Sequence, residues 1–435
     1  MSFFDGRKDK TKIMRYNEET DKFYSCVKKE EHYSVTIEPS GKYAFHFTQI
    51  EATKTISHAK QIALRIVRWL AENNGSETLL AIGGDSTNTN TGWKGGVMTW
   101  VEKLLGRKLI WIVCGLHVNE LPLRSLIENL DGKTSSGTGL SGPLGKALEK
   151  VGELPLNPCY EKIVTSADLP SMSDEVVNDL SKDQKHAFKL WAAIRSGEMT
   201  SDLAAMACGP INHSRWLTTA NRFCSLWTRK HGFVGENLQN LNMIVKWIVG
   251  SYYPMWFKMK INHHWIHGPC HLLYQLQLWR EHNDVVQNLT HETIQRGAYY
   301  AHSEHLLQSL LCSSEEENRR FAVNKIIEIR EQREKDAEEP KPKKKCLKIS
   351  SNNDTVRSRV TPEINFHAIS LKDLIKWDKD LHEPILTLKY TNEDLQEFYS
   401  QPMNVPVFGL HTQSIERCVK QVIALVLKYL SIHLF

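Results

Sequence analysis

The segment Thr78–Leu123, TLLAIGGDSTNTNTGWKGGVMTWVEKLLGRKLIWIVCGLHVNELPL, alternates apolar runs and polar steps in a pattern typical of an α/β domain. The apolar run Leu79–Ile82 predicts a buried strand, which leads into a glycine pair and the acid Asp85. Apolar spacing predicts a helix over Val97–Leu105, and a second apolar run predicts a strand over Leu109–Val113. Domains built in this order carry their functional side chains at the carboxyl ends of the strands.

Asp85 has two interpretations when only its neighbours in the chain are considered. An Asp that follows a glycine pair commonly caps a turn or the start of a helix. An acid at the end of a buried strand also stands where α/β proteins place their chemistry. The local pattern favours the capping role.

The start of the chain repeats the step from apolar strand to acid. Residues Phe3–Arg7, FFDGR, predict the end of a strand and place Asp5 there. Two further strands are predicted over His32–Glu38 and Lys42–Thr48, and helical spacing predicts a helix over Ile56–Leu70. A turn acid near the chain terminus is the alternative role for Asp5.

The runs GGDSTNTNTGWKGG and WIVCGLHVNELPLR resemble the central segment of ribonuclease-H-like transposases of the hAT kind. In that family a strand ends in the second catalytic Asp, an Asn-rich loop follows, and a Cys-x-x-His step comes after the next strand. The resemblance implies an α/β fold in which a ribonuclease-H-like mixed sheet, flanked by helices, is interrupted by a large all-α insertion domain. It makes Asp85 the second catalytic acid, with supporting roles for Asn88, Asn90, Cys114 and His117.

The same resemblance supplies the other two acids. FFDGRKDK occupies the place of the first catalytic acid, which is Asp5 here. The Ser-x-Glu-Arg step that begins at Ser414 looks like the start of the late helix that carries the third acid, Glu416. The alternative role for Glu416 is to complement the dipole of that helix from its first turn.

Three further residues are candidates for contact with nucleic acid. Arg215 and Trp216 look like the Arg-Trp step at the start of the family's helical insertion, and Arg417 follows the third acid. A Trp can stack on an unpaired base. A Trp spaced helically among apolar residues is more often a core residue, which is the alternative for Trp216.

Two Asp and one Glu in contact require positive charge to remain ionised. Mg²⁺ or Mn²⁺ supplies it, and two such ions about 4 Å apart stabilise the attacking and leaving oxygens at phosphorus. The resemblance therefore implies a two-metal site at Asp5, Asp85 and Glu416, with cleavage and strand transfer of DNA, the transposon ends, as the ancestral reaction.

Four regions are predicted along the chain. They are the first part of the ribonuclease-H-like core (1–165), the helical insertion (166–338), a basic linker (339–362), and a return segment with the final core helix (363–435). The zinc-finger domain that precedes the core in the family is absent from this sequence, so we expect a truncated or transposon-derived copy.

Three other segments carry possible chemistry. The Gly-, Ser- and Thr-rich stretch Asp131–Leu156 lacks the spacing of a P-loop, so a flexible connector is favoured over a phosphate site. The cluster His263–His271 matches no regular zinc module, so structural zinc is not expected. The basic run Lys341–Lys348 is typical of nuclear import or nucleic-acid contact, and of a solubilising tether.

Composition sets the compartment and the class. The 435 residues carry a formal charge of +5, which is compatible with nucleic acid, and nine Cys without a regular framework indicate a reducing compartment. The start of the chain is charged and shows no secretory signal, and the apolar run Val422–Phe435 is too short to span a membrane. We expect a soluble homo-oligomer in the nucleus, or otherwise in the cytoplasm, without a membrane partner.

Two alternatives to the transposase interpretation stay open. The same fold without catalysis would be a DNA- or protein-binding scaffold that oligomerises through its helical block. GGDSTNTNTG could instead be the phosphate loop of a nucleotide-binding enzyme, which a structure with Asp85 far from Asp5 would favour.

Overall fold

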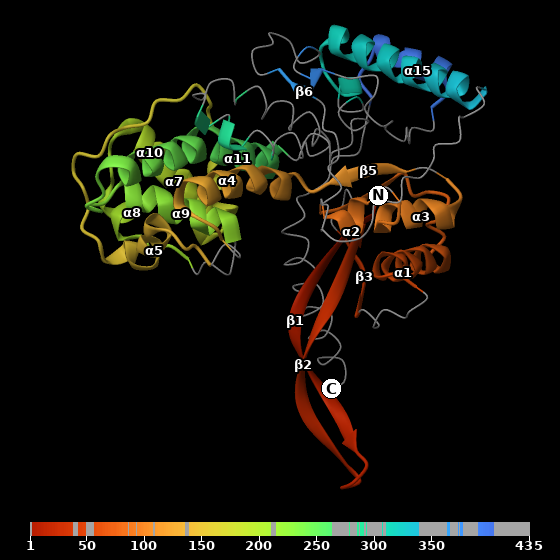
Figure 1. Cartoon of the computed structure of the whole chain (residues 1–435), viewed down its shortest axis with the longest axis horizontal. Coiled ribbons are helices and arrows are strands. Elements are labelled where there is room, and N and C mark those ends of the chain that lie inside the picture. Colours follow the sequence, from red (N-terminus) through yellow and green to blue (C-terminus); the bar gives the residue numbers. More distant parts are fainter. Residues whose placement is uncertain are drawn as a thin grey trace, which may run out of the picture.

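The computed structural model describes residues 2–37, 42–48, 56–85, 87–92, 94–107, 109–134, 139–209, 215–262, 310–338 and 390–403, with short pieces within 278–307 and 363–376. A mixed five-stranded sheet in the order β3-β2-β1-β4-β5 forms its centre (Figure 1). Its strands are β1 (Ser2–Asn17), β2 (Lys22–Ile37), β3 (Lys42–Thr48), β4 (Ala81–Gly84) and β5 (Ile110–Val113).

The sheet combines two kinds of strand pairing. Strands β1, β2 and β3 form an antiparallel meander, whereas β1, β4 and β5 are mutually parallel neighbours. Parallel neighbours need a crossover, which α1 (His58–Glu72) and α3 (Val97–Leu105) supply. The mixed α/β class predicted from the sequence is confirmed.

Helices cover both faces of this sheet. Because successive side chains of a strand point to opposite faces, Phe3 and Phe4 join two different cores. The Phe4 core contains the apolar sides of α1 and α3. The Phe3 core contains α4 (Gly115–Asp131) and continues into the helical block beyond it.

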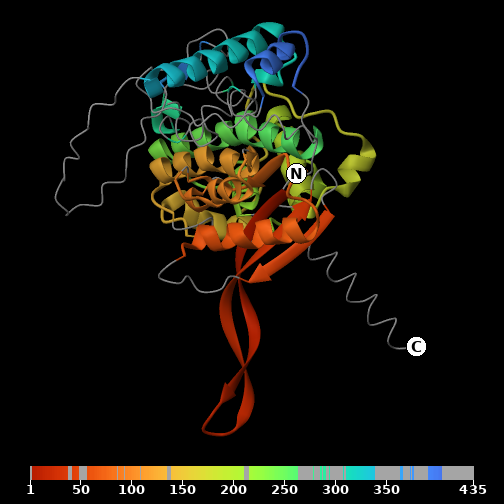
Figure 2. The ribbon, with the colours of Figure 1, turned by 90° about the vertical axis from the view of Figure 1, so that its right-hand side faces the viewer.

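β1 and β2 extend far beyond the sheet as a two-stranded arm that projects from the body of the molecule in both views (Figures 1 and 2). Their antiparallel ladder runs from Ser2 and Ile37 to Asn17 and Lys22. The prediction that the first strand ends near Arg7 is therefore wrong. Charged residues interrupt the alternation of apolar and polar residues in the arm. Its strands have no buried face, so the sequence does not show the period-two pattern that predicts a strand.

The helical block gathers beside the sheet (Figure 1). Its core joins α4 to α7, α9, α10 and α11, so one apolar core runs across residue 165. The boundary of the insertion at 165/166 stays a prediction. The remaining helices of the described part are α2 (Asn88–Thr91), α5 (Pro143–Ala147), η1 (Leu148–Glu153), α6 (Asp174–Asp179), α7 (Lys182–Ser196), α8 (Ser201–Ala205), α9 (Arg215–Trp227), α10 (Gly235–Trp247), the π-helical turn η2 (Ile248–Tyr252), α11 (Tyr253–Asn262), α15 (Glu316–Glu338), α17 (Asn392–Gln396) and η4 (Glu397–Tyr399).

The stretch predicted as a flexible connector contributes to the core. Leu144, Leu148 and Val151 are buried within α5 and η1. The buried carboxylate of Asp131 accepts hydrogen bonds from the amides of Leu144 (2.8 Å) and Gly145 (2.6 Å), so it fixes the start of α5. Because these amides are already bound by an acid, they are not available to an incoming phosphate.

Several predictions fall on residues outside the described part: Glu416, Arg417, His263–His271, Lys341–Lys348 and the linker 339–362. Two short strands, β6 (Glu363–Ile364) and β7 (Ile375–Lys376), pair with each other. No helix in the part of the chain that the structure describes is long and apolar enough to cross a membrane.

Candidate active site at the ends of the parallel strands

The register between β1 and β4 brings two of the predicted acids together. Ser2 pairs with Ile82 and Phe3 pairs with Gly83, in parallel. Asp5 and Asp85 each lie two residues beyond the last of these pairs. Because the strands run in the same direction, both acids lie at the same end of the sheet. In contrast to the prediction, only Asp85 stands at a strand end, since β1 continues past Asp5 into the arm.

The end of β5 lies beside Asp85. The amide of Cys114 donates a hydrogen bond of 2.8 Å to the carbonyl of Gly84, which continues the β4–β5 ladder to its last residues. Cys114 is the residue before α4, and His117 lies in the first turn of that helix. Asp85, Cys114 and His117 therefore lie at the ends of adjacent parallel strands or in the helix that follows.

The charges of both acids contribute to pKa shifts of buried groups on each face of the sheet. Burial is the main cause that raises the pKa of the Cys114 thiol to about 12, and the charges of Asp5 and Asp85 add to it. Burial also raises the pKa of Tyr33 above its usual range, and the same two acids contribute there. Since Tyr33 belongs to the Phe4 core and Cys114 to the Phe3 core, the acids act on groups of both faces. A thiol with this pKa is protonated at neutral pH and is not a nucleophile.

The carboxylate of Asp85 is held through one of its two oxygens. Oδ1 accepts hydrogen bonds from the Thr87 amide (2.9 Å), the Thr87 hydroxyl (2.6 Å) and Asn90 Nδ2 (2.7 Å). Asn90 is buried, and the short helix α2 carries it. Among the described residues no hydrogen bond ends on Oδ2, so this oxygen can serve as a ligand while Oδ1 is kept in place.

The supporting residues predicted from the sequence have different positions. Asn90 binds Asp85, whereas the side chain of Asn88 is exposed and none of the described hydrogen bonds joins it to the acid. Thr87 was not predicted. Its signal is the Asp-x-Thr spacing, which lets an Asp side chain accept a hydrogen bond from the amide two residues later.

A third described acid near the strand ends, Glu120, was also not predicted. It raises the pKa of Cys114 more than Asp5 or Asp85 does, although less than burial. His117 Nδ1 lies 4.0 Å from Glu120 Oε2, one helical turn along α4. An acid one turn beyond a Cys-x-x-His step is the sequence signal for this pair.

Asp5 and Asp85 provide two carboxylates, which is fewer than a complete metal site needs. In the described ranges no three or more His, Cys, Asp or Glu side chains are close enough together to hold a metal ion. The third predicted acid, Glu416, and its neighbour Arg417 lie outside those ranges. The cation site with three acids therefore stays a prediction.

Trp216 is not a surface residue. Its side chain is 6% exposed and packs in the core of the helical block, at the beginning of α9. The burial of its indole favours the core role, which helical spacing among apolar neighbours also indicated, over stacking on a base. Arg215 begins α9, and its side chain lies outside the part of the chain that the structure describes.

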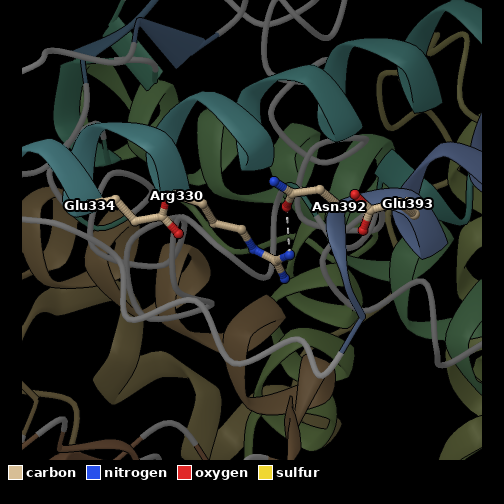
Figure 3. Close-up of a pocket in the computed structure, with 4 residues that line it drawn as sticks. All are labelled: Arg330, Glu334, Asn392 and Glu393. Carbon is tan, nitrogen blue, oxygen red and sulfur yellow. Dashed lines mark hydrogen bonds between the residues drawn. The ribbon is translucent and has the colours of Figure 1, made fainter.

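A polar hollow of about 440 Å³ lies between α15 and α17 (Figure 3). It is lined by Arg330, Glu334, Asn392 and Glu393, none of which belongs to the sheet. Arg330 Nη1 donates a hydrogen bond of 2.9 Å to Asn392 Oδ1, so its guanidinium ties the two helices together. This contact indicates a structural role for the hollow.

Comparison with known proteins assigns no family. No family model matches the chain, and no curated protein matches it. Among solved structures, a Drosophila P element transposase strand transfer complex is similar at 10% identity, with 72% of each chain covered and a TM-score of 0.21. A TM-score this low does not define a shared fold, so we base the functional proposal on the geometry of the strand ends.

Proposed function

We propose that this chain contains a divalent-cation-dependent phosphoryl-transfer site that acts on DNA, on a ribonuclease-H-like core of transposon origin and of the hAT kind. The observation that carries the proposal is the position of Asp5 beside Asp85 on parallel neighbouring strands. The resemblance of GGDSTNTNTG and the Cys-x-x-His step to hAT transposases supports the choice of DNA as substrate.

The chemistry of the donor set fits Mg²⁺ or Mn²⁺. Two like-charged carboxylates at one sheet edge need a compensating charge, and hard carboxylate oxygens are the ligands these ions prefer. Asp5 and Asp85 Oδ2 would hold the ion, and Glu416 would complete the site. The bound ion would supply charge neutralisation at the scissile phosphate.

The residues around Asp85 would set its orientation. Thr87 and Asn90 fix Oδ1 by three hydrogen bonds, which leaves the carboxylate a single direction in which to present Oδ2. Attack of water on a DNA phosphodiester would give strand cleavage, and attack of a DNA 3′-hydroxyl would give strand transfer.

Nicking of supercoiled plasmid DNA in Mn²⁺ or Mg²⁺ tests the enzymatic proposal. The wild-type chain should nick the DNA, and Asp85→Asn should reduce nicking to background. Asn keeps the acceptor oxygen for Thr87 and Asn90, so the variant should fold normally. Equal nicking by both proteins, or none by either, would exclude the enzymatic proposal and favour the scaffold.

The catalytically inactive scaffold is the second candidate. It keeps the same fold, and the nicking assay distinguishes it from the enzyme. The nucleotide-binding alternative loses support, because it expected Asp85 to lie far from Asp5.

A nuclear address belongs to the same proposal. It rests on the basic run Lys341–Lys348. Changing Lys343, Lys344 and Lys345 to Ala in a reporter fusion should abolish nuclear accumulation, and an unchanged nuclear signal would refute it.

A further inference from the structure

The outer part of the arm formed by β1 and β2, from the Lys10/Lys29 pair to the tip, has one exposed face. Residues that are directly opposite each other in the ladder point to the same side, so every second residue of each strand shares a face. On one face of the arm, most side chains are half-buried. On the other, which we call the open face, all eight side chains from the Lys10/Lys29 pair to the tip are exposed: Lys10, Lys12, Met14, Tyr16, Phe23, Ser25, Val27 and Lys29.

Charge and apolarity are ordered along this open face. Lys10 is opposite Lys29 nearest the body, Lys12 is opposite Val27, and Tyr16 is opposite Phe23 near the tip. The connecting turn carries Glu18 and Glu19, both exposed. From base to tip, the open face therefore presents a basic pair, a mixed pair, the Met14/Ser25 pair, an aromatic pair and an acidic turn.

The open face exposes apolar surface that solvent does not favour. Phe23 and Val27 are each 67% exposed, Met14 is 61% exposed and Tyr16 is 50% exposed. Within the described structure the main apolar contact at the tip is between the rings of Tyr16 and Phe23, whose centroids are 5.1 Å apart. A two-stranded hairpin without a packed face is only marginally stable in water.

The charges of the open face are also unfavourable in an isolated arm. Like charges directly opposite each other in a ladder repel, which applies to Lys10 and Lys29. Glu18 and Glu19 gather negative charge at the tip. An acidic group placed over the lysine pair, and a basic group placed at the turn, would relieve both.

We propose that the open face is a dimerisation surface whose partner is the same arm of a second copy of this chain, packed antiparallel about a two-fold axis near Met14. In that arrangement the acidic turn, Glu18 and Glu19, lies over Lys10 and Lys29 of the other copy. The aromatic pair lies over the mixed pair, where a lysine and an aromatic ring attract each other. A two-fold axis makes both contacts twice.

The same acidic turn argues against nucleic acid as the occupant of this face. A β-ribbon can enter the major groove, but its tip would meet the phosphate backbone. Glu18 and Glu19 would repel phosphates at that tip. When two copies of the open face pair, the lysines and the glutamates both meet opposite charges. A polyanion would neutralise only the lysines.

Two charge-reversed variants test the proposal: Lys10→Glu with Lys29→Glu, and Glu18→Lys with Glu19→Lys. All four side chains are exposed, so both variants should fold. Each variant alone places like charges at both contacts, and its self-association by analytical ultracentrifugation should weaken about tenfold or more. An equimolar mixture should form the mixed dimer, because each tip then meets an opposite charge on the partner.

The mixture makes the outcome decisive. Restored association supports the antiparallel arm pair and shows that both variants are folded. Unchanged self-association of both variants, or weak association that mixing does not restore, would overturn the proposal. A third outcome, tighter binding of plasmid DNA by the Glu18/Glu19 variant with association unchanged, would assign the face to nucleic acid. The Asp85→Asn variant should dimerise normally, so the result does not depend on the proposed activity.

Discussion

Phe3 and Gly83 are paired across the parallel β1–β4 ladder, and this pair sets the position of Asp5 relative to Asp85. The ladder is short, since only Ser2 and Ile82 extend it, so the packing of Phe3 matters. Phe3 is buried against Ala81, Ile112 and the helices of its face. The proposed site therefore depends on a buried aromatic residue that has no chemical role itself.

Asn90 should position Asp85, and Asn88 offers a matched control. Asn90→Ala removes the 2.7 Å hydrogen bond to Asp85 Oδ1, so Mn²⁺-dependent nicking should fall about 10- to 100-fold, as for other groups that orient a metal ligand. Asn88→Ala, in the same helix but exposed, should leave nicking unchanged. An equal loss in both variants would mean that α2 as a whole, rather than the Asn90 amide, supports the site.

Glu102 should be essential for the stability of the α3–β5 junction. Its buried Oε1 accepts hydrogen bonds from the Leu109 amide (3.0 Å) and Trp111 Nε1 (2.9 Å). Glu102→Ala leaves both donors buried without an acceptor, so the free energy of unfolding should fall by about 2–4 kcal/mol. Urea unfolding measures it.

Two variants make the Glu102 prediction specific. Glu102→Gln keeps an acceptor oxygen and should lose less stability than Glu102→Ala. The exposed Glu77→Ala should change stability little. If Glu102→Gln is as destabilised as Glu102→Ala, the charge rather than the hydrogen-bond geometry is what the junction needs.

His186 should make the fold sensitive to mild acid. Burial, with smaller contributions from Arg229, Lys182 and Lys189, lowers the pKa of His186 from 6.5 to about 4. Between these pH values the unfolded chain binds the proton and the folded chain does not. Stability attributable to this residue is therefore complete above pH 6.5 and declines as the pH falls toward 4, by at most about 3 kcal/mol.

The His186→Phe variant isolates this contribution. Urea unfolding at pH 7.5 and pH 5 should show a smaller acid-induced loss in the variant than in the wild-type chain. Other groups titrate in the same range, so the difference between the two proteins is the quantity to compare. An identical loss of stability in both proteins would show that His186 has the same pKa in the folded and unfolded chain and would contradict the prediction.

Sequence patterns predicted the parts of the fold that have one apolar face. The spacing over Val97–Leu105 predicted the bounds of α3, which buries a regular set of side chains. The run Lys42–Thr48 predicted those of β3, whose Phe45 and Phe47 are partly buried against the Phe4 core. The arm was not predicted, because its exposed strands mix lysines with apolar residues. Its length became visible only in the pairing of β1 with β2.

The site was predictable in its residue types but not in its contacts. Asp5 and Asp85 could be proposed from strand-end patterns and a family resemblance. Asn88 and Asn90 are the same residue type and cannot be distinguished in the sequence. In the structure, the direction of the short helix α2 buries Asn90, which donates a hydrogen bond to Asp85, and leaves Asn88 exposed. Asp131 looked like part of a connector because its partners, the amides at the start of α5, are brought to it by the tertiary fold.

Mn²⁺ binding followed by electron paramagnetic resonance tests most directly whether Asp5 and Asp85 share a cation. Wild type, Asp5→Asn, Asp85→Asn and the double variant would be titrated, with the exposed Asp202→Asn as control. We predict that each single substitution at the site removes the same bound ion, that the double variant loses no more, and that the control binds normally. Unchanged Mn²⁺ binding in both single variants would contradict the shared site.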